Sequence, residues 1–313
     1  MTNDAPVPAG PAVPGPEAPA TDVGPVGVIG IGAIGRPMAH RLLATHGALT
    51  VTGRTRRDDD SLPAAGATWA ATPRELAATA RTILLMLPDL PEVEQVLAGE
   101  DGLLAGVAEP TLLLIGSTSS PTGVRALAER LARETGGLVR VVDCPVSGGV
   151  DGAAAGTLAI MLGGADDDVA RAARVMAACG NPVHLGPLGA GQVAKACNQM
   201  IVASTILALG EASVLADRSG IDLGTLWDLL GGGFAGSNLL ASCRDKLVAG
   251  DDTPAGVARY MVKDLRFAAD VAEATGTSPA LLPALRASFD ELVASGYGDR
   301  DITVTRRFVA ERD

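Results

Sequence analysis

The glycine-rich segment at residues 30–35 constrains the fold more than any other feature of this sequence. Gly30, Gly32 and Gly35 lie at the end of an apolar run, Val26–Ile31, and at the start of a helical pattern. In a strand-turn-helix unit the first glycine permits the tight turn, the second lets the backbone approach a pyrophosphate, and the third lets the helix pack on the strand. Free N–H groups at the helix start also favour phosphate. The segment predicts dinucleotide binding, with candidate contacts at Gly30, Ile31, Gly32, Ala33, Ile34 and Gly35.

Apolar runs alternate with amphipathic stretches through the first half of the chain. Near-continuous apolar runs suit parallel strands that are covered on both faces, and a capping box at residues 72–75 indicates a helix start. The expected strands are Val26–Ile31, Leu49–Thr52, Thr82–Leu87, Leu112–Ile115 and Val139–Val142. Two shorter strands, Leu158–Leu162 and Val183–Leu185, are expected to extend the same sheet. This alternation predicts an α/β fold that begins with a doubly wound Rossmann domain.

After Pro187 the strand pattern stops, and an all-helical C-terminal domain is expected. A long helix from Gln192 to about Arg218 is apolar almost all round, so it should be buried in that domain or against a partner subunit. Gly220 is expected to end it, and Asp222 to cap the next helix. The further expected helices are Asp222–Leu230, Ser237–Val248, Ala255–Ala274 and Ala280–Ser295.

These patterns divide the chain into three parts. Residues 1–22 form a Pro/Ala-rich tail that is expected to be disordered, because it has little to bury. Residues 23–187 are assigned to the dinucleotide-binding Rossmann domain. Residues 188–313 are assigned to a helical domain for substrate binding and dimerisation.

Composition excludes several classes of partner. A formal net charge of −11 argues against nucleic acid, which binds through clustered Lys and Arg. Four widely spaced cysteines and three histidines show no metal-ligand spacing, so no metal site is expected, and free thiols suit a reducing cytoplasm. No hydrophobic signal follows the start, and the longest apolar run, Met200–Leu209, is too short to span a bilayer. We expect a cytoplasmic protein without a membrane partner.

The end of the second expected strand bears on the choice of cofactor. An NAD site normally has an acidic residue here, but none occurs before Asp58. Arg54, followed by Thr55, could instead meet the 2′-phosphate of NADP, because a guanidinium binds phosphate oxygens in pairs. The alternative is a solvated basic loop balanced by the acidic residues 58–60. We favour NADP as the cofactor, with NAD as the other possibility.

Lys195 is the strongest candidate for chemistry. It lies on the long apolar helix, where Asn198 and Gln199 are spaced to share its face. Desolvation lowers the pKa of a buried lysine towards neutrality, which suits a group that protonates the alkoxide formed in carbonyl reduction. A structural lysine that snorkels to the surface is the alternative. Upstream, Ser147 and the N–H groups of Gly148 and Gly149 form a segment that could hold an anion.

The three segments 30–35, 143–149 and 189–199 occur in an order that resembles the β-hydroxyacid dehydrogenase family, which includes 3-hydroxyisobutyrate dehydrogenase and tartronate semialdehyde reductase. The resemblance covers residues 24–313. It implies reversible hydride transfer between NAD(P) and a small β-hydroxyacid or semialdehyde, in a homodimer or homotetramer. It also implies that Ser147, Gly148 and Gly149 anchor the substrate carboxylate, while Lys195 moves the proton with Asn198 and Gln199. The implied cofactor neighbours are Leu87, Pro88, Ser117, Thr118 and Lys263.

Two positions depart from the family pattern. Gly116 stands where many members have Asp, and Gln199 stands where Asn is frequent. Two other functions are possible on this fold. An imine reductase-like NADPH enzyme typically replaces the lysine, so Lys195 argues against it. A non-catalytic NADP-binding scaffold would be expected to have lost the lysine or the Ser-Gly-Gly segment at 147–149, and both are present.

Overall fold

The computed structural model describes residues 23–56 and 61–312 of this chain. Its N-terminal half contains a six-stranded parallel sheet in the order β3-β2-β1-β4-β5-β6, which confirms the doubly wound fold. The strands are β1 (Val26–Ile29), β2 (Thr50–Thr52), β3 (Thr68–Trp69), β4 (Thr82–Leu85), β5 (Thr111–Ile115) and β6 (Val139–Asp143). The short β3 was not predicted. The tail predicted for residues 1–22 lies outside the described residues.

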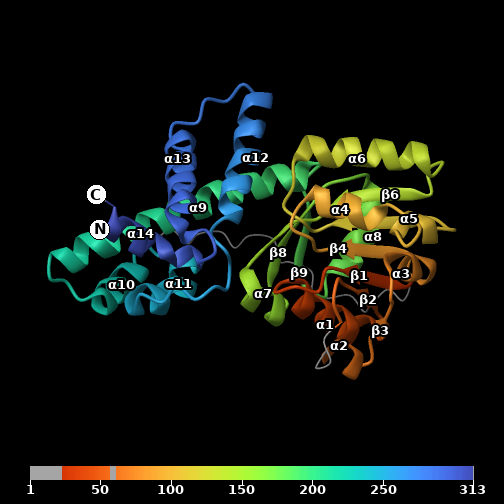
Figure 1. The fold of residues 1–313 in the computed structure, drawn as a ribbon, viewed down its shortest axis with the longest axis horizontal. Helices are drawn as coiled ribbons and strands as arrows, with labels where there is room; N and C mark the ends of the chain where they lie inside the picture. The colour runs from red at the N-terminus through yellow and green to blue at the C-terminus, as the bar shows by residue number, and fades with distance from the viewer. Residues whose placement is uncertain (1–22, 57–60, 313) are drawn as a thin grey trace, which may run out of the picture.

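Helices cover both faces of this sheet (Figure 1). Successive side chains of β4 alternate between two cores: Leu84 packs with α1 and α8, whereas Ile83 and Leu85 pack with α3, α4 and α6. Because both faces are buried, the central strands β1, β4 and β5 are apolar at most positions. The helices are α1 (Gly35–His46), α2 (Ser61–Ala64), α3 (Pro73–Thr79), α4 (Leu90–Leu97), α5 (Leu103–Gly106), α6 (Pro121–Glu134), α7 (Gly149–Ala155) and α8 (Asp166–Met176).

The two shorter strands do not extend this sheet, and that expectation was wrong. They correspond to β8 (Leu158–Leu162) and β9 (Gly180–His184), which form a separate three-stranded sheet with β7 (Val146–Ser147), in the order β7-β8-β9. An isolated bridge between Asp143 and Gly163 joins the two sheets. An apolar run shows that a strand is buried, but it does not show which strand is its neighbour.

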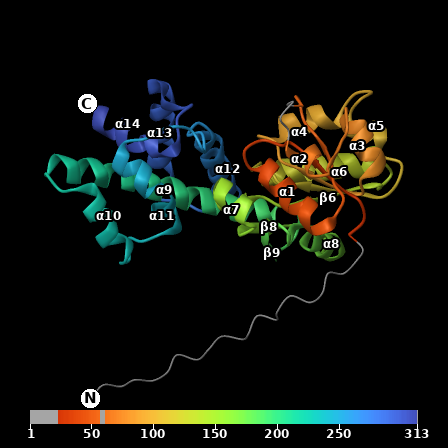
Figure 2. The ribbon, with the colours of Figure 1, turned by 90° about the horizontal axis from the view of Figure 1, so that it is seen from below.

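The second half of the described chain is helical. The long helix α9 (Ala190–Arg218) runs from the sheet region into the C-terminal helices and packs against α11, α12 and α14 (Figure 1). Strand β8 lies beside α9 where the two halves meet (Figure 2). The remaining helices are α10 (Leu223–Gly231), α11 (Asn238–Ala249), α12 (Tyr260–Ala274), α13 (Leu282–Leu292), a π turn (Val293–Tyr297), a 3₁₀ turn (Ile302–Val304) and α14 (Thr305–Glu311).

By length and composition, α9 is the one helix among the described residues that could cross a membrane. The core helix of a soluble protein meets the same criteria, and 39% of the most apolar stretch of α9 is buried inside the protein.

Several helix ends follow the sequence signals. Asp222 caps α10 by accepting a hydrogen bond from the N–H of Thr225, and Gly220 adopts a positive φ of 77° just after α9. The capping box at α3 is only partly formed: Thr72 accepts from the N–H of Glu75, but the Glu75 carboxylate reaches the N–H of Ala71 instead of that of Thr72.

Candidate active site

The glycine turn after β1 has the geometry that a dinucleotide site requires. Gly30 has a φ of 97°, and a Cβ there would lie 2.2 Å from the carbonyl oxygen of Met86. A Cβ on Gly35 would lie 2.0 Å from the carbonyl oxygen of Gly30, so this glycine is needed where α1 meets the strand. A Cβ on Gly32 would meet no atom within 4 Å, so the exposed backbone there stays open to a pyrophosphate. These residues fit the expected cofactor.

The turns after β4 and β5 lie at the same sheet edge, because the carboxyl ends of parallel strands coincide there. The N–H of Leu87 donates to Ser117 Oγ at 3.2 Å, which joins the two turns. Thr118 lies next to Ser117, and its carbonyl oxygen accepts from Lys263 Nζ at 2.8 Å. Four of the predicted cofactor neighbours are therefore connected around one edge, and the fifth, Pro88, is exposed beside Leu87. A side chain at Gly116 would run into Met86 Sδ, so methionine fills the space of the expected Asp.

Arg54 and Thr55 follow β2 and are exposed. The Arg56 guanidinium lies 5.8 Å from the centre of the Trp69 ring. Residues 57–60, which include the acidic side chains that could balance this loop, lie outside the described residues.

Lys195 lies on the second turn of α9 and is 8% exposed. Burial lowers the pKa of Lys195 to about 8, partly offset by the nearby Asp264 carboxylate and reinforced by the Lys263 ammonium. The direction agrees with the sequence prediction. No described residue forms a hydrogen bond or ion pair with its Nζ. The three N–H donors of the ammonium are therefore available to another molecule.

The polar side chains around Lys195 form one connected row. Ser147 Oγ donates to Asn198 Oδ1 at 3.2 Å, and Asn198 Nδ2 donates to Gln199 Oε1 at 3.0 Å. Gln199 Nε2 then donates to Asp264 Oδ2 at 2.6 Å, and Lys263 Nζ donates to Asp264 Oδ1 at 2.8 Å. This polar row, Ser147 to Lys263, ends at the cofactor edge through Thr118.

The row changes what was expected of the two carboxamides. Sequence reasoning paired Asn198 and Gln199 with the lysine, whereas each of them bonds to other members of the row. Gln199 is long enough to reach Asp264 on α12, which gives a physical role to this departure from the family pattern.

Ser147 is half-buried, and Gly148 and Gly149 are exposed at the start of α7. Both glycines have positive φ, 137° and 65°, which L-residues with side chains rarely adopt. The turn thus presents its backbone beside Ser147, and Ser147 contacts Asn198 on the face of α9 that carries Lys195.

Comparison with known proteins agrees with this arrangement. Residues 25–189 match the family described as the NAD binding domain of 6-phosphogluconate dehydrogenase. Residues 189–309 match the family described as NAD-binding of NADP-dependent 3-hydroxyisobutyrate dehydrogenase. The chain belongs to the 3-hydroxyisobutyrate dehydrogenase family. Members of this family are dehydrogenases that bind a nicotinamide dinucleotide and act on small hydroxyacids.

Named relatives cover nearly the whole chain. An NAD-dependent L-serine dehydrogenase from Pseudomonas aeruginosa is 36% identical over 284 residues, which cover 88% of this chain and 94% of that protein. The crystal structure of 3-hydroxyisobutyrate dehydrogenase from Salmonella typhimurium has a TM-score of 0.81 and 28% identity, covering 90% and 98% of the two chains. The Mycobacterium tuberculosis 3-hydroxyisobutyrate dehydrogenase with L-serine has a TM-score of 0.76 and 28% identity, covering 91% and 99%.

An imine reductase from Myxococcus stipitatus is 18% identical over 91% of this chain and 99% of its own, with a TM-score of 0.59. At that identity the likeness shows the fold alone.

Two buried polar residues that hold the start of α9, Asp143 at the end of β6 and Gln192 on α9 itself, were missed as functional candidates in this dehydrogenase. Asp143 and Gln192 are both fully buried, and hydrogen bonds connect them to α9 and to the cofactor edge. A signal for Gln192 was available, because it is a polar residue on an apolar helix three positions before Lys195. Asp143 begins the segment 143–149 that carries the family resemblance, but no role was predicted for it, because an acidic residue after a strand also suits an ordinary turn.

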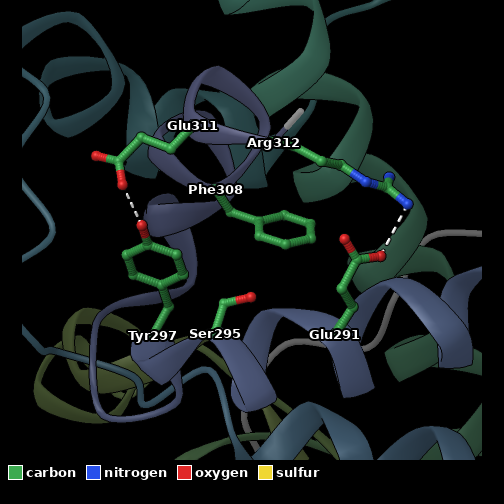
Figure 3. Close-up of a pocket in the computed structure, with 6 residues that line it drawn as sticks. All are labelled: Glu291, Ser295, Tyr297, Phe308, Glu311 and Arg312. Atoms are coloured by element: carbon green, nitrogen blue, oxygen red, sulfur yellow. Dashed lines mark hydrogen bonds and ion pairs between the residues drawn. The ribbon is translucent and has the colours of Figure 1, made fainter.

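A separate pocket of about 500 Å³ lies between the C-terminal segments (Figure 3). Its polar side chains pair with one another: Tyr297 donates to Glu311, and Arg312 pairs with Glu291 at 2.8 Å. Neither Lys195 nor the turns at the sheet edge line it. The pocket is therefore separate from the candidate site formed by the polar row and Lys195.

Proposed function

We propose that this chain catalyses reversible hydride transfer between a nicotinamide dinucleotide and a small carboxylated semialdehyde or β-hydroxyacid. The observation that carries the proposal is Lys195, a buried ammonium with a pKa lowered to about 8 and free donors, next to a row of polar groups that reaches the cofactor edge. A lysine in this state can give and take a proton near neutral pH.

In this proposal, the residues near Ser147 bind the substrate and Lys195 transfers the proton. Ser147 and the backbone of Gly148 and Gly149 hold the substrate carboxylate, and this fixes the reacting carbon relative to Lys195. The bound cofactor supplies or accepts the hydride. In reduction, Lys195 donates a proton to the oxygen of the new hydroxyl group; in oxidation, it removes that proton. The hydrogen bonds among Asn198, Gln199 and Asp264 fix the position of Ser147 relative to the face of α9 that carries Lys195.

An assay of small semialdehydes and of 2- and 3-hydroxyacids, L-serine and 3-hydroxyisobutyrate included, with both NADPH and NADH, tests this function. We expect turnover of at least one three- or four-carbon acid, with reduction slowing above pH about 8 as Lys195 loses its proton. Lys195→Met should lower kcat by about 10²–10⁴-fold, the usual value of a general acid, while cofactor binding survives. Lys246→Met, a lysine paired with Asp301 outside the site, is the matched control.

Full activity of Lys195→Met would rule out the proton-transfer role. Binding of NADPH without turnover of any compound would favour a scaffold protein, and turnover of imines alone would favour an imine reductase.

We further propose that NADP is the preferred cofactor. Support comes from exposed Arg54 directly after β2 and from the absence of an acidic residue between Thr52 and Arg57. The Pseudomonas aeruginosa relative, by contrast, is named NAD-dependent.

Arg54→Asp should raise the NADH-to-NADPH ratio of kcat/KM at least tenfold, because it replaces a phosphate partner with a hydroxyl acceptor. Arg74→Asp makes the same charge change at another exposed site and should leave the ratio unaltered. Parent enzyme that already prefers NADH strongly would contradict the proposal.

A further inference from the structure

The first turn of α9 is held by two buried side chains that the reaction itself does not use. We propose that Asp143 and Gln192 are positioning residues, which hold this turn, and through it Lys195, against the cofactor edge of the six-stranded sheet. The inference rests on the function proposed above.

Asp143 fastens the helix start to the end of β6. Its side chain has no exposed surface, Oδ1 accepts from the N–H of Gly189, and Oδ2 accepts from the N–H of Gln192, both at 2.7 Å. The first N–H groups of a helix have no partner within the helix, and a negative charge is favourable there. One carboxylate thus satisfies two orphan donors of a 29-residue helix.

Two glycines make room for this carboxylate. A Cβ on Gly163 would lie 2.4 Å from Asp143 Oδ1, and a Cβ on Gly191 would lie 2.8 Å from Oδ2 and 2.3 Å from the carbonyl oxygen of Met161. Any larger residue would push the helix away from Asp143. The close approach of α9, β6 and β8 therefore depends on both glycines.

Gln192 fastens the same turn to the cofactor edge. Its side chain is 1% exposed; Oε1 accepts from the N–H of Ser119 at 2.9 Å, and Nε2 donates to the carbonyl oxygen of Ser117 at 2.8 Å. Ser117 Oγ in turn accepts from the N–H of Leu87. The turns after β4 and β5 are thereby linked to α9 by hydrogen bonds.

These hydrogen bonds determine the position of Lys195. It is three residues after Gln192, so the two side chains lie on neighbouring positions of one helix face. If the turn moved outward, water would reach Lys195 and its pKa would rise from about 8 towards 10.5. The charged groups that face it are Asp264 and Lys263 of α12. A displacement of the ammonium would also misalign it with the substrate oxygen.

The test uses Gln192→Met, which keeps the volume but removes both hydrogen bonds, and Asp143→Asn, which loses the charge and one acceptor. The matched control is Asp301→Asn, because Asp301 is also a buried carboxylate that accepts backbone N–H groups, from Ala255 and Gly256, away from the site. The chain has only three lysines. Selective ¹³C labelling of lysine therefore lets Lys195 be titrated by NMR in the full-length protein, without any assay.

We expect Lys195 to titrate at least one pH unit higher in both test variants than in the parent. We also expect kcat to fall about 10- to 100-fold, as a small misplacement predicts, with the NADPH Kd changed less than about threefold. Asp301→Asn should lose thermal stability but keep the lysine titration and kcat. Test variants that behave like Asp301→Asn would overturn the proposal.

If Asp143→Asn does not fold, Gln192→Met alone decides. A parent protein without any turnover would refute the proposed function, and the lysine titration would still decide whether Asp143 and Gln192 position Lys195.

Discussion

Lys195 makes the folded chain less stable than an apolar side chain of similar size would. Its pKa falls from 10.5 to about 8 on folding, because the charged form is desolvated. A base whose pKa is lowered by folding costs stability below its folded pKa, and the cost disappears above its unfolded pKa. At about 1.4 kcal/mol for each pH unit, the cost at pH 7 is on the order of 3 kcal/mol.

Lys195→Met should therefore stabilise the fold at pH 7 while it removes activity. The gain should shrink between pH 8 and 10.5 and vanish above that range. Urea unfolding of both proteins across this range measures it. An equal or lower stability of Lys195→Met at pH 7 would show that the ammonium has a partner or water that offsets its burial.

At the scale of single elements, helix α3 offers a test of capping that is separate from the active site. Thr72 Oγ1 accepts from the N–H of Glu75 at 3.1 Å. Thr72→Ala should lower the free energy of unfolding by about 1 kcal/mol, the usual cost of a lost N-cap. Thr72→Ser retains the hydroxyl and should restore most of this loss. Unfolding by denaturant, with kcat unchanged, checks the prediction; a change in kcat would mean that α3 influences the site.

The elements of this fold could be predicted where local pattern decides them. Strand β1 and the helix after Asp222 follow directly from the apolar run and from a capping residue. Helix α12 starts at Tyr260, five residues later than expected from Ala255, because Val257 forms a bridge with Asp301 and the N–H of Arg259 donates to the carbonyl oxygen of Gly298. Such long-range bonds leave no trace in local periodicity.

In the site, too, some residues could be predicted from local sequence and others could not. Lys195 stands out in the sequence because a charge on an apolar helix is unusual. The row from Ser147 through Asn198 to Asp264 joins segments 51 and 65 residues apart. It could be seen only after the two halves were placed together. The roles of these residues stay predictions until variants are measured.

At the scale of the whole molecule, apolar side chains remain exposed on the C-terminal helices. Ile201 and Leu215 on α9 are 62% and 70% exposed, and Leu229 on α10 is 74% exposed. Large exposed apolar surface is uncommon on soluble monomers, and two-fold pairing is the commonest way to cover it. We propose that the chain forms at least a homodimer through these helices.

Light scattering at micromolar concentration should then give at least twice the chain mass. The double change Ile201→Glu and Leu215→Glu should produce monomers, whereas Leu281→Glu, an exposed leucine before α13, should not. Removal of residues 1–22 should leave the dimer intact. A fully active monomer of the parent chain would contradict the proposal.

Helix α9 is continuous over about 43 Å. The N–H of Gly189, just before its start, donates to the carboxylate of Asp143, 46 residues earlier in the chain. This limits recombination between relatives. A chimera joined at any point between Asp143 and Gly189 takes the carboxylate from one parent and the helix start from the other. Such crossovers should succeed only when the two parents share the aspartate at 143 and the glycines at 163 and 191 that let the helix approach it. Joints placed before β6, or beyond Arg218, inherit carboxylate and helix as one unit.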